Sequence, residues 1–338
     1  ERKIILSDSG QVTSVAFRDR LDAHRLIEEF MILANVAAAE TLIKKRSPLL
    51  FRVHEEPAPE KLESLRETAM AAGFPLAKGQ VLQTRHLNAL LNGAAGTDDA
   101  ELINISPLRS MQQAYYAPAP FGHFGLALRN YAHFTSPIRR YADLIVHRSL
   151  ISAHGWGDDG LSPAEIEGLA ETATHISETE RRSMIAERDT TDRYLASYLA
   201  ERVGNEFTGR ISGIARFGAF VKLDETGADG LVPVRSIGRE YFHFDPNAGT
   251  LMGSDTGLLI TIGQRVTVRL TQAAPVTGGL ELELLALEDA ELPKGRGGGP
   301  GKGGHRRSPA GRTVTRSKAA KAKHKAAKVK RKVARKRK

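Results

Sequence analysis

The spacing of apolar residues changes once along this chain, near residue 204, and that change limits the possible folds more than any other feature. Before it, apolar side chains recur every three to four residues, as at Leu26, Ile27, Phe30 and Met31, which is the spacing of an amphipathic helix. After it, apolar and polar residues alternate, as over residues 265–270 and 280–284, which is typical of strands with one buried face. The sequence therefore predicts an α+β chain in which a helix-rich part precedes a β-rich part.

The helix-rich part, residues 1–203, is predicted to be a mixed α/β arrangement. A hairpin is expected over residues 3–17, followed by a long helix over residues 22–45 and a short strand over residues 49–54. Shorter helices are expected at residues 59–72 and 83–91, whereas residues 106–130, dense in Tyr, Phe, Pro and Gly, are expected to be mostly irregular. The last helix is predicted over residues 162–202, with a break near Ser177.

The β-rich part, residues 204–288, is predicted to be a small barrel. Strand-like segments occur at residues 207–214, 217–223 and 230–234, in addition to the two alternating segments named above. Five short strands within about 85 residues are typical of the closed barrel of the OB fold. Residues 238–263 form an insertion between the third and fourth strands. Beyond it, residues 289–338 are predicted to be a disordered basic tail, because Gly, Lys, Arg and Ala cannot bury enough surface to offset the chain entropy.

Charge is concentrated in that tail. Residues 291–338 hold 19 Lys and Arg against a single acid, Glu291, a net charge of +18, whereas the preceding 290 residues carry a net charge of −8. A cationic arm on a mildly acidic body indicates a polyanionic partner. The absence of cysteine excludes disulfides and thiolate metal sites and fits a cytoplasmic protein. No apolar run approaches the ~20 residues of a membrane span, and no membrane association is expected.

One segment, residues 131–144, has the features of an anion site. Ser136 is a good helix N-cap and Pro137 suits the first helical position, so a helix is predicted to begin there. Arg139 and Arg140 would lie in its first turn, beside free amides and the positive end of the helix dipole. Because an arginine fork can hold a phosphate in a bidentate manner, the segment predicts binding of a phosphodiester. The alternative, an ordinary capped helix whose arginines pair with surface acids, is equally consistent with these residues alone.

Residues 123–126 (His-Phe-Gly-Leu) and 131–148 resemble the signature of the catalytic domain of the RNase II/RNase R family, and residues 26–35 resemble the same domain. The resemblance covers residues 1 to about 202 and implies a processive 3′→5′ exoribonuclease that releases nucleoside 5′-monophosphates by metal-assisted hydrolysis, usually with Mg²⁺. In that family an aspartate cluster holds the metal, and it would precede Glu1. The chain has no initiating Met, so we expect that it begins inside a domain, that the metal ligands lie upstream, and that the chain alone is inactive.

The resemblance assigns roles to particular residues. It implies that Arg139 holds the phosphate near the scissile bond, that Glu28 contacts the terminal nucleotide, and that Glu187 lines the site, with Glu180 as an alternative to Glu187. Ser136 and Arg140 are predicted to contact RNA beside Arg139. Without the resemblance, each glutamate would be interpreted as a solvated helix acid. The spacing of His123, His133 and His147 does not resemble a compact metal-ligand motif, so these histidines are interpreted as packing or supporting groups.

The barrel contributes a second predicted contact with RNA. On a regular strand Phe217 and Phe220 would face opposite sides, but Gly218 permits a bulge that brings both rings to one surface. Arg210, Arg216 and Lys222 are close in sequence, and aromatic rings beside cations are typical of single-stranded nucleic-acid binding. Residues 217–223 and 230–232 resemble the S1 family of RNA-binding domains, although Pro233 and Arg235 depart from its usual residues. The alternative is that both phenylalanines belong to the core.

Two functions follow from these observations. The first is the phosphate-gripping part of an exoribonuclease acting as a monomer on single-stranded 3′ ends, with structured RNA and the ribosome as further partners. The second is a binding module without chemistry, which attaches to RNA or to the ribosome through the barrel and the basic tail. An aspartate cluster in the preceding sequence would favour the enzyme, because only the enzyme requires it.

Overall fold

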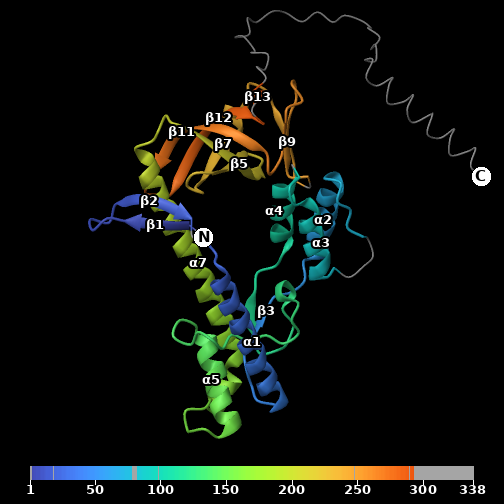
Figure 1. Cartoon of the computed structure of the whole chain (residues 1–338), viewed down its shortest axis with the longest axis vertical. Helices are drawn as coiled ribbons and strands as arrows, with labels where there is room; N and C mark the ends of the chain where they lie inside the picture. Colours follow the sequence, from blue (N-terminus) through green and yellow to red (C-terminus); the bar gives the residue numbers. More distant parts are fainter. Residues whose placement is uncertain are drawn as a thin grey trace, which may run out of the picture. The chain divides into compact units, whose positions relative to one another are not determined.

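The computed structural model describes residues 2–17, 19–77, 82–97, 99–246, 248–288 and 290–292. Figure 1 shows the order of the elements, from the β1–β2 hairpin and helix α1 to the barrel strands. The predicted basic tail lies outside the described residues, apart from its first few positions. There, Ala290–Glu291 forms the short strand β13 and pairs with the last barrel strand.

The first elements agree with the prediction. Strands β1 (Arg2–Leu6) and β2 (Val12–Phe17) form an antiparallel hairpin, and helix α1 covers Asp22–Lys44. Only the second half of α1 is buried, through Asn35, Ala38, Ala39 and Leu42. Its first half is exposed, including Leu26 and Phe30. The apolar spacing therefore predicts the helix correctly, but no described residues bury much of its apolar face.

Short strands and three small helices come next. Strand β3 (Phe51–Val53) pairs antiparallel with β4 (Tyr115–Ala117). Between them lie α2 (Pro59–Ala71), α3 (Thr84–Ala94) and α4 (Ala100–Ser110), followed by the 3₁₀ turn η1 (Phe124–Leu126). Helix α4 extends into residues 106–110, where irregular structure was predicted. Burial of Ile103 and Pro107 holds this helix, and the local composition gives no sign of that tertiary contact.

Helix α5 covers Tyr141–His154, so the predicted start at Ser136 and Pro137 is wrong. Residues 137–139 instead form a turn closed by the amides of Arg139 and Arg140 on the carbonyl of Ser136. The predicted break near Ser177 is also wrong. Helix α6 (Pro163–Glu167) ends at Gly168, and α7 runs without interruption over Leu169–Ala200. Figure 1 shows α5 lying beside α1 and α7, and residues of these helices are in contact.

The barrel consists of β5 (Glu206–Ala215), β6 (Gly218–Leu223), β7 (Asp229–Pro233), β11 (Arg265–Ala274) and β12 (Gly279–Leu287). The strands follow the order β11-β5-β6-β7-β12, and the additional pairing of β11 with β12 closes them, which confirms the predicted five-stranded barrel. The insertion contains α8 (Val234–Ile237) and the strands β8 (Phe242–Asp245), β9 (Thr250–Gly253) and β10 (Leu259–Ile260), which form a separate antiparallel sheet.

The barrel and the helical part share one hydrophobic core. Leu195, Ala196 and Leu199, at the end of α7, pack with barrel residues such as Ile211 and Val268. These side chains are almost completely buried. The predicted α+β fold class is therefore confirmed, and helix α7 fixes the barrel to the part of the chain that precedes it.

Candidate functional site

The loop between η1 and α5 is anchored to helix α1 by one buried asparagine. The side-chain oxygen of Asn35 accepts hydrogen bonds from the backbone amides of Phe134 (2.8 Å) and Thr135 (3.2 Å). Its side-chain nitrogen donates to the hydroxyl of Tyr131 at 3.0 Å. Because a buried polar group is stable only when it is hydrogen-bonded, Asn35 fixes this loop. No role for Asn35 was predicted, although an asparagine among the apolar residues of a helix is a recognisable signal in the sequence.

Asp143 fixes the next part of the same loop. Its carboxylate is completely buried and accepts the backbone amide of Ser136 at 2.7 Å. It also accepts both sides of the Arg140 guanidinium fork, at 2.7 Å from Nε and 2.8 Å from Nη2. A bidentate pair of this kind is geometrically specific. Ser136 and Arg140, predicted to contact RNA, thus have structural partners, and the Nε–Nη2 edge of the Arg140 guanidinium is occupied by Asp143.

Arg139 is placed differently. Its side chain is exposed, and within the described part of the chain its guanidinium forms no ion pair. The neighbouring Ile138 is fully exposed as well. The turn at residues 137–139 therefore presents Arg139 outward from a fixed base. An exposed guanidinium with free donors is able to take a phosphate in a bidentate manner.

The two predicted glutamates lie on uncovered helix faces. Glu28 is in α1 and Glu187 in α7, and every residue in the stretches 21–30 and 181–190 is exposed. Glu28 forms an ion pair with Arg20, and both side chains are exposed. Exposed ion pairs contribute little stability. Among the described residues, neither glutamate forms a hydrogen bond or an ion pair with Arg139.

Glu180, the alternative to Glu187, has a structural partner. Both of its carboxylate oxygens accept hydrogen bonds from Arg52, at 2.6 and 3.1 Å. The Arg52 guanidinium also lies 4.7 Å from the centre of the Tyr116 ring, which is a cation–π distance. Glu180 therefore ties α7 to β3 and β4, and Glu187 is the glutamate of the two that remains accessible.

Two histidines of the motif, His123 and His133, are partly buried, and burial lowers the pKa of both. The hydroxyl of Tyr116 lies 2.9 Å from His133 Nδ1. Burial, together with the positive charges of Arg140 and Arg52, lowers the pKa of His133 to about 3. Burial and the neighbouring His54 lower the pKa of His123 to about 4.

His147 has a backbone partner and an aromatic one. Its Nε2 lies 2.9 Å from the carbonyl oxygen of Phe134, and its ring stacks on the ring of the same residue with 4.4 Å between the ring centres. Each of the three motif histidines thus has a packing partner. These contacts agree with their interpretation as packing or supporting groups.

The described residues contain no cluster of side chains that could bind a metal ion. No three His, Cys, Asp or Glu side chains among them come close enough to hold one together. Mg²⁺ prefers carboxylate oxygens and water in octahedral geometry, and the acids of this part are either paired or dispersed. No chemical step can therefore be assigned to a metal on these residues.

No helix within the described ranges has the length and hydropathy needed to span a membrane.

The barrel carries an exposed aromatic pair. Phe217 and Phe220 have 58% and 36% of their surface exposed, so the interpretation of both as core residues is wrong. Their ring centres lie 5.9 Å apart at an angle of 87°. The bulge predicted at Gly218 is not found there, because β6 begins at Gly218 and pairs with β7 without a register shift, whereas the shift lies between Ile211 and Gly213 of β5. Gly218 has a φ of +156°, and a Cβ there would lie 2.2 Å from the carbonyl oxygen of Val232. We call Phe217 and Phe220 the aromatic platform.

Positive residues adjoin the platform in the sequence and in the β5–β6 ladder. Lys222 and Arg216 are exposed, and among the described residues neither forms an ion pair. Arg210 is half-buried and donates to the carbonyl of Gly263 at 3.1 Å. Lys222 lies opposite Arg210 in the β5–β6 ladder. Aromatic rings beside uncompensated cations are suited to single-stranded nucleic acid, because the bases stack and the phosphates are neutralised.

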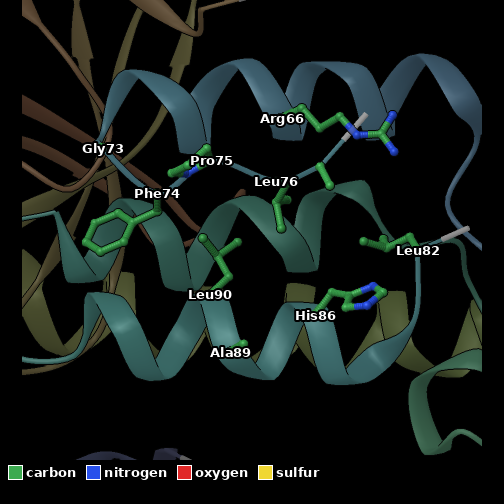
Figure 2. A pocket seen from close by; sticks show the side chains of 10 residues that line it. Arg66, Gly73, Phe74, Pro75, Leu76, Leu82, His86, Ala89 and Leu90 are labelled. Atoms are coloured by element: carbon green, nitrogen blue, oxygen red, sulfur yellow. The ribbon is translucent and has the colours of Figure 1, made fainter. Parts of the chain in front are cut away.

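Two cavities lie away from the predicted site residues. One, of about 360 Å³, lies between α2 and α3, with Phe74 at one end and Arg66 and His86 toward the other (Figure 2). The second, an open cleft of about 920 Å³, is lined by the turn around His123 and by Arg85 and Arg129. None of the predicted catalytic or RNA-binding residues lines either cavity.

Comparison with known proteins decides the family. The RNB domain family matches residues 1–154, and the S1 RNA binding domain family matches residues 201–284. Ribonuclease R of Escherichia coli strain K12 is 37% identical over 329 residues, which cover 93% of this chain and 40% of the relative. The chain belongs to the RNB ribonuclease family. It spans about 40% of the length of this relative, so the activity of the whole relative does not transfer directly.

The fold of this RNB family member agrees with a solved relative. The apo form of Mycoplasma genitalium RNase R superposes with a TM-score of 0.78 at 30% identity, covering 84% of this chain and 45% of that one. The same protein in complex with ribose-methylated single-stranded RNA gives the same TM-score, identity and coverage. The likeness covers most of this chain but less than half of the relative.

Proposed function

We propose that this chain is the phosphate-gripping part of a 3′→5′ exoribonuclease that hydrolyses RNA processively to nucleoside 5′-monophosphates. The observation that carries the proposal is the state of Arg139, which is exposed and has no ion pair with any described residue, at a turn fixed by the buried Asp143 carboxylate. An arginine is protonated at every physiological pH. It would therefore hold a phosphodiester next to the scissile bond without needing a partner acid to keep it charged.

RNA is the substrate that the remaining surface favours. The aromatic platform and its cations suit unpaired bases and a phosphate backbone. The Mycoplasma genitalium relative has been solved with single-stranded RNA, and an S1 RNA binding domain matches the barrel. Glu28 and Glu187 would meet the RNA from α1 and α7, because both carboxylates are accessible.

Hydrolysis would need groups beyond the described residues. In this family divalent ions, usually Mg²⁺, would activate the attacking water and neutralise charge on the phosphate. The described residues do not fit that ion, because they contain no cluster of ligands for it. We therefore expect residues 1–338 alone to bind RNA and to release no mononucleotides in the presence of Mg²⁺. Chromatography of the products of a labelled RNA checks this, and mononucleotide release would contradict it.

The role of Arg139 is tested in a protein that carries both halves of the site. A chimera joins the amino-terminal part of the Escherichia coli relative to this chain, and its hydrolysis and RNA affinity are measured in parallel. We expect Arg139→Ala to lower turnover by 10²-fold or more while affinity falls much less. Arg139→Lys keeps the charge but not the fork, so it should recover turnover only in part. Equal losses of turnover and affinity would count against the proposal.

The second candidate is a binding module without chemistry, attached to RNA or to the ribosome. The observation that favours it is the absence of a ligand set for a metal among the described residues, together with an intact aromatic platform. The chimera discriminates between the two functions. If it binds RNA tightly and releases no mononucleotides at any Mg²⁺ concentration, while the Escherichia coli enzyme does so under the same conditions, the binding module is the better description.

A further inference from the structure

Helix α4 reaches the face of the barrel that carries the aromatic platform. Arg109, near the end of α4, donates a hydrogen bond from Nη2 to the carbonyl of Ser212 in β5. The same helix packs tightly on the loop before β11, since a Cβ at Gly263 would lie 3.1 Å from the amide nitrogen of Leu102. Two separate contacts thus hold α4 against the barrel, and the position of the Arg109 guanidinium is fixed.

That guanidinium lies next to Phe220. In the β5–β6 ladder Gly213 is the partner of Phe220. A Cβ at Gly213 would lie 3.1 Å from Arg109 Nη2 and 3.4 Å from Phe220 Cδ2. The cation and the ring therefore approach the same point on the barrel surface from two sides, and a glycine at this position leaves room for both.

The charge of Arg109 is not compensated. A carbonyl oxygen occupies one of its five donors, and the described residues provide no carboxylate that forms an ion pair with it. Burial lowers the pKa of Arg109 from its ordinary value, as expected for a cation without a partner, but an arginine remains charged at neutral pH. Asp229, at the start of β7, accepts a hydrogen bond from the Ser212 hydroxyl at 3.2 Å instead.

We propose that Arg109 is a phosphate-binding residue of a composite site, in which the base of a single-stranded RNA stacks on Phe217 and Phe220 and the adjoining phosphate contacts the guanidinium from α4. This inference rests on the proposed function, because it takes RNA to be the ligand of the platform. It adds that the RNA site does not belong to the barrel alone. The hydrogen bond to Ser212 orients the guanidinium, and its remaining donors face the ligand.

The obvious alternative is that Arg109 is only a strut between α4 and the barrel. The two roles differ in one measurable quantity. Each phosphate neutralised on single-stranded RNA contributes about −0.7 to the slope of log affinity against log salt concentration. A strut whose loss distorts the site would lower affinity without changing that slope, whereas loss of a phosphate contact would change both.

The test compares Arg109→Gln with the parent chain, using fluorescence anisotropy of a labelled oligouridylate at several salt concentrations. Glutamine keeps a donor for the Ser212 carbonyl but removes the charge. We expect roughly tenfold weaker binding at low salt and a slope about 0.7 less negative. Arg109→Lys should keep the slope, because a lysine also neutralises a phosphate. Arg46→Ala, which removes an equal charge from the turn after α1, should leave both quantities close to those of the parent.

The outcomes separate this inference from the proposed function. If the parent chain binds oligouridylate and Phe220→Ala weakens binding, while Arg109→Gln leaves the slope and the affinity unchanged, the inference is overturned and the platform stands. A weaker Arg109→Gln complex with the parent's slope would also overturn it, in favour of the strut. If the parent does not bind the RNA at all, the proposed function itself fails. Thermal unfolding of each variant verifies that the comparison is made between folded proteins.

Discussion

Arg139 and Arg140 are neighbours in the chain, but different contacts hold their guanidinium groups. Arg140 forms a bidentate pair with the completely buried Asp143, and Arg139 is exposed without an ion pair among the described residues. We expect Arg140→Ala to lower the free energy of unfolding by about 3–5 kcal/mol, because it leaves an uncompensated buried charge. Arg139→Ala should change that free energy by less than about 0.5 kcal/mol, as an exposed substitution does. Urea titrations of the two variants measure the contrast, and similar free energies would contradict it.

His133 makes stability depend on pH. Its pKa is lowered to about 3 in the folded protein by burial and by the charges of Arg140 and Arg52, whereas the unfolded chain has the ordinary value near 6.5. Between these two values the unfolded state binds a proton that the folded state does not. The free energy of unfolding should therefore fall as the pH drops below about 6.5, by up to about 1.4 kcal/mol per pH unit for one histidine.

The measurement for His133 is urea unfolding between pH 4.5 and 7.5. His133→Gln keeps an acceptor for the Tyr116 hydroxyl but does not titrate, so its stability should fall less steeply toward low pH than that of the parent. His123, with its pKa lowered to about 4, contributes in the same direction and remains in the variant. The exposed His175 provides the matched control, His175→Gln. A parent and His133→Gln with parallel pH profiles would refute the assignment.

At the scale of single elements, the start of the β6 strand depends on one glycine. Gly218 has a φ of +156°, and a Cβ there would lie 2.2 Å from the carbonyl oxygen of Val232. We expect Gly218→Ala to lower the free energy of unfolding by at least about 1–3 kcal/mol through backbone strain. It should also weaken RNA binding, since the two rings of the platform would separate. Gly157→Ala, at a position where the nearest atom would be 4.0 Å away, is the control for both measurements.

Elements were predictable from sequence where local spacing decides them. The hairpin, helix α1 and all five barrel strands follow from their apolar periods. The start of α5 was not predictable in this way. Ser136 and Pro137 have the residue types of a helix start, but Asp143, in the first turn of α5, binds the Ser136 amide and the Arg140 fork. Burial of this carboxylate thus overrides the capping preference of Ser136.

In the candidate site, too, some features were predictable from local sequence and others depend on contacts between distant residues. The exposure of Phe217 and Phe220 agrees with the prediction, but the bulge expected at Gly218 lies instead in the facing strand, between Ile211 and Gly213. Asn35 and Arg109 were not assigned, since their importance comes from contacts with residues about 100 positions away. Ser177 was expected to break α7, but its hydroxyl donates to Ala173 and accepts the Tyr116 amide. Both bonds satisfy the serine within a continuous helix.

At the scale of the whole molecule, helix α7 joins the helical part to the barrel through a shared core. Leu195 and Leu199 are buried among barrel side chains, so a stable barrel requires the end of this helix. The residues that we propose to contact RNA lie on both parts, with Glu187 on α7 and the platform at the start of β6. A ligand that contacts both Glu187 and the platform would therefore meet two surfaces whose relative position is fixed by packing and not by a free linker.

The basic tail would contribute to RNA binding through its charge. Residues 291–338 carry 19 Lys and Arg and a single acid. Deleting residues 293–338 should make the slope of log RNA affinity against log salt less negative by about 0.7 for each phosphate that the tail neutralises. A tail of equal length with every Lys and Arg replaced by Gln should behave like the deletion, because it removes charge but keeps length. Since the platform cations remain in both variants, some salt dependence persists. An unchanged slope after deletion would mean that RNA is bound by the folded surface alone.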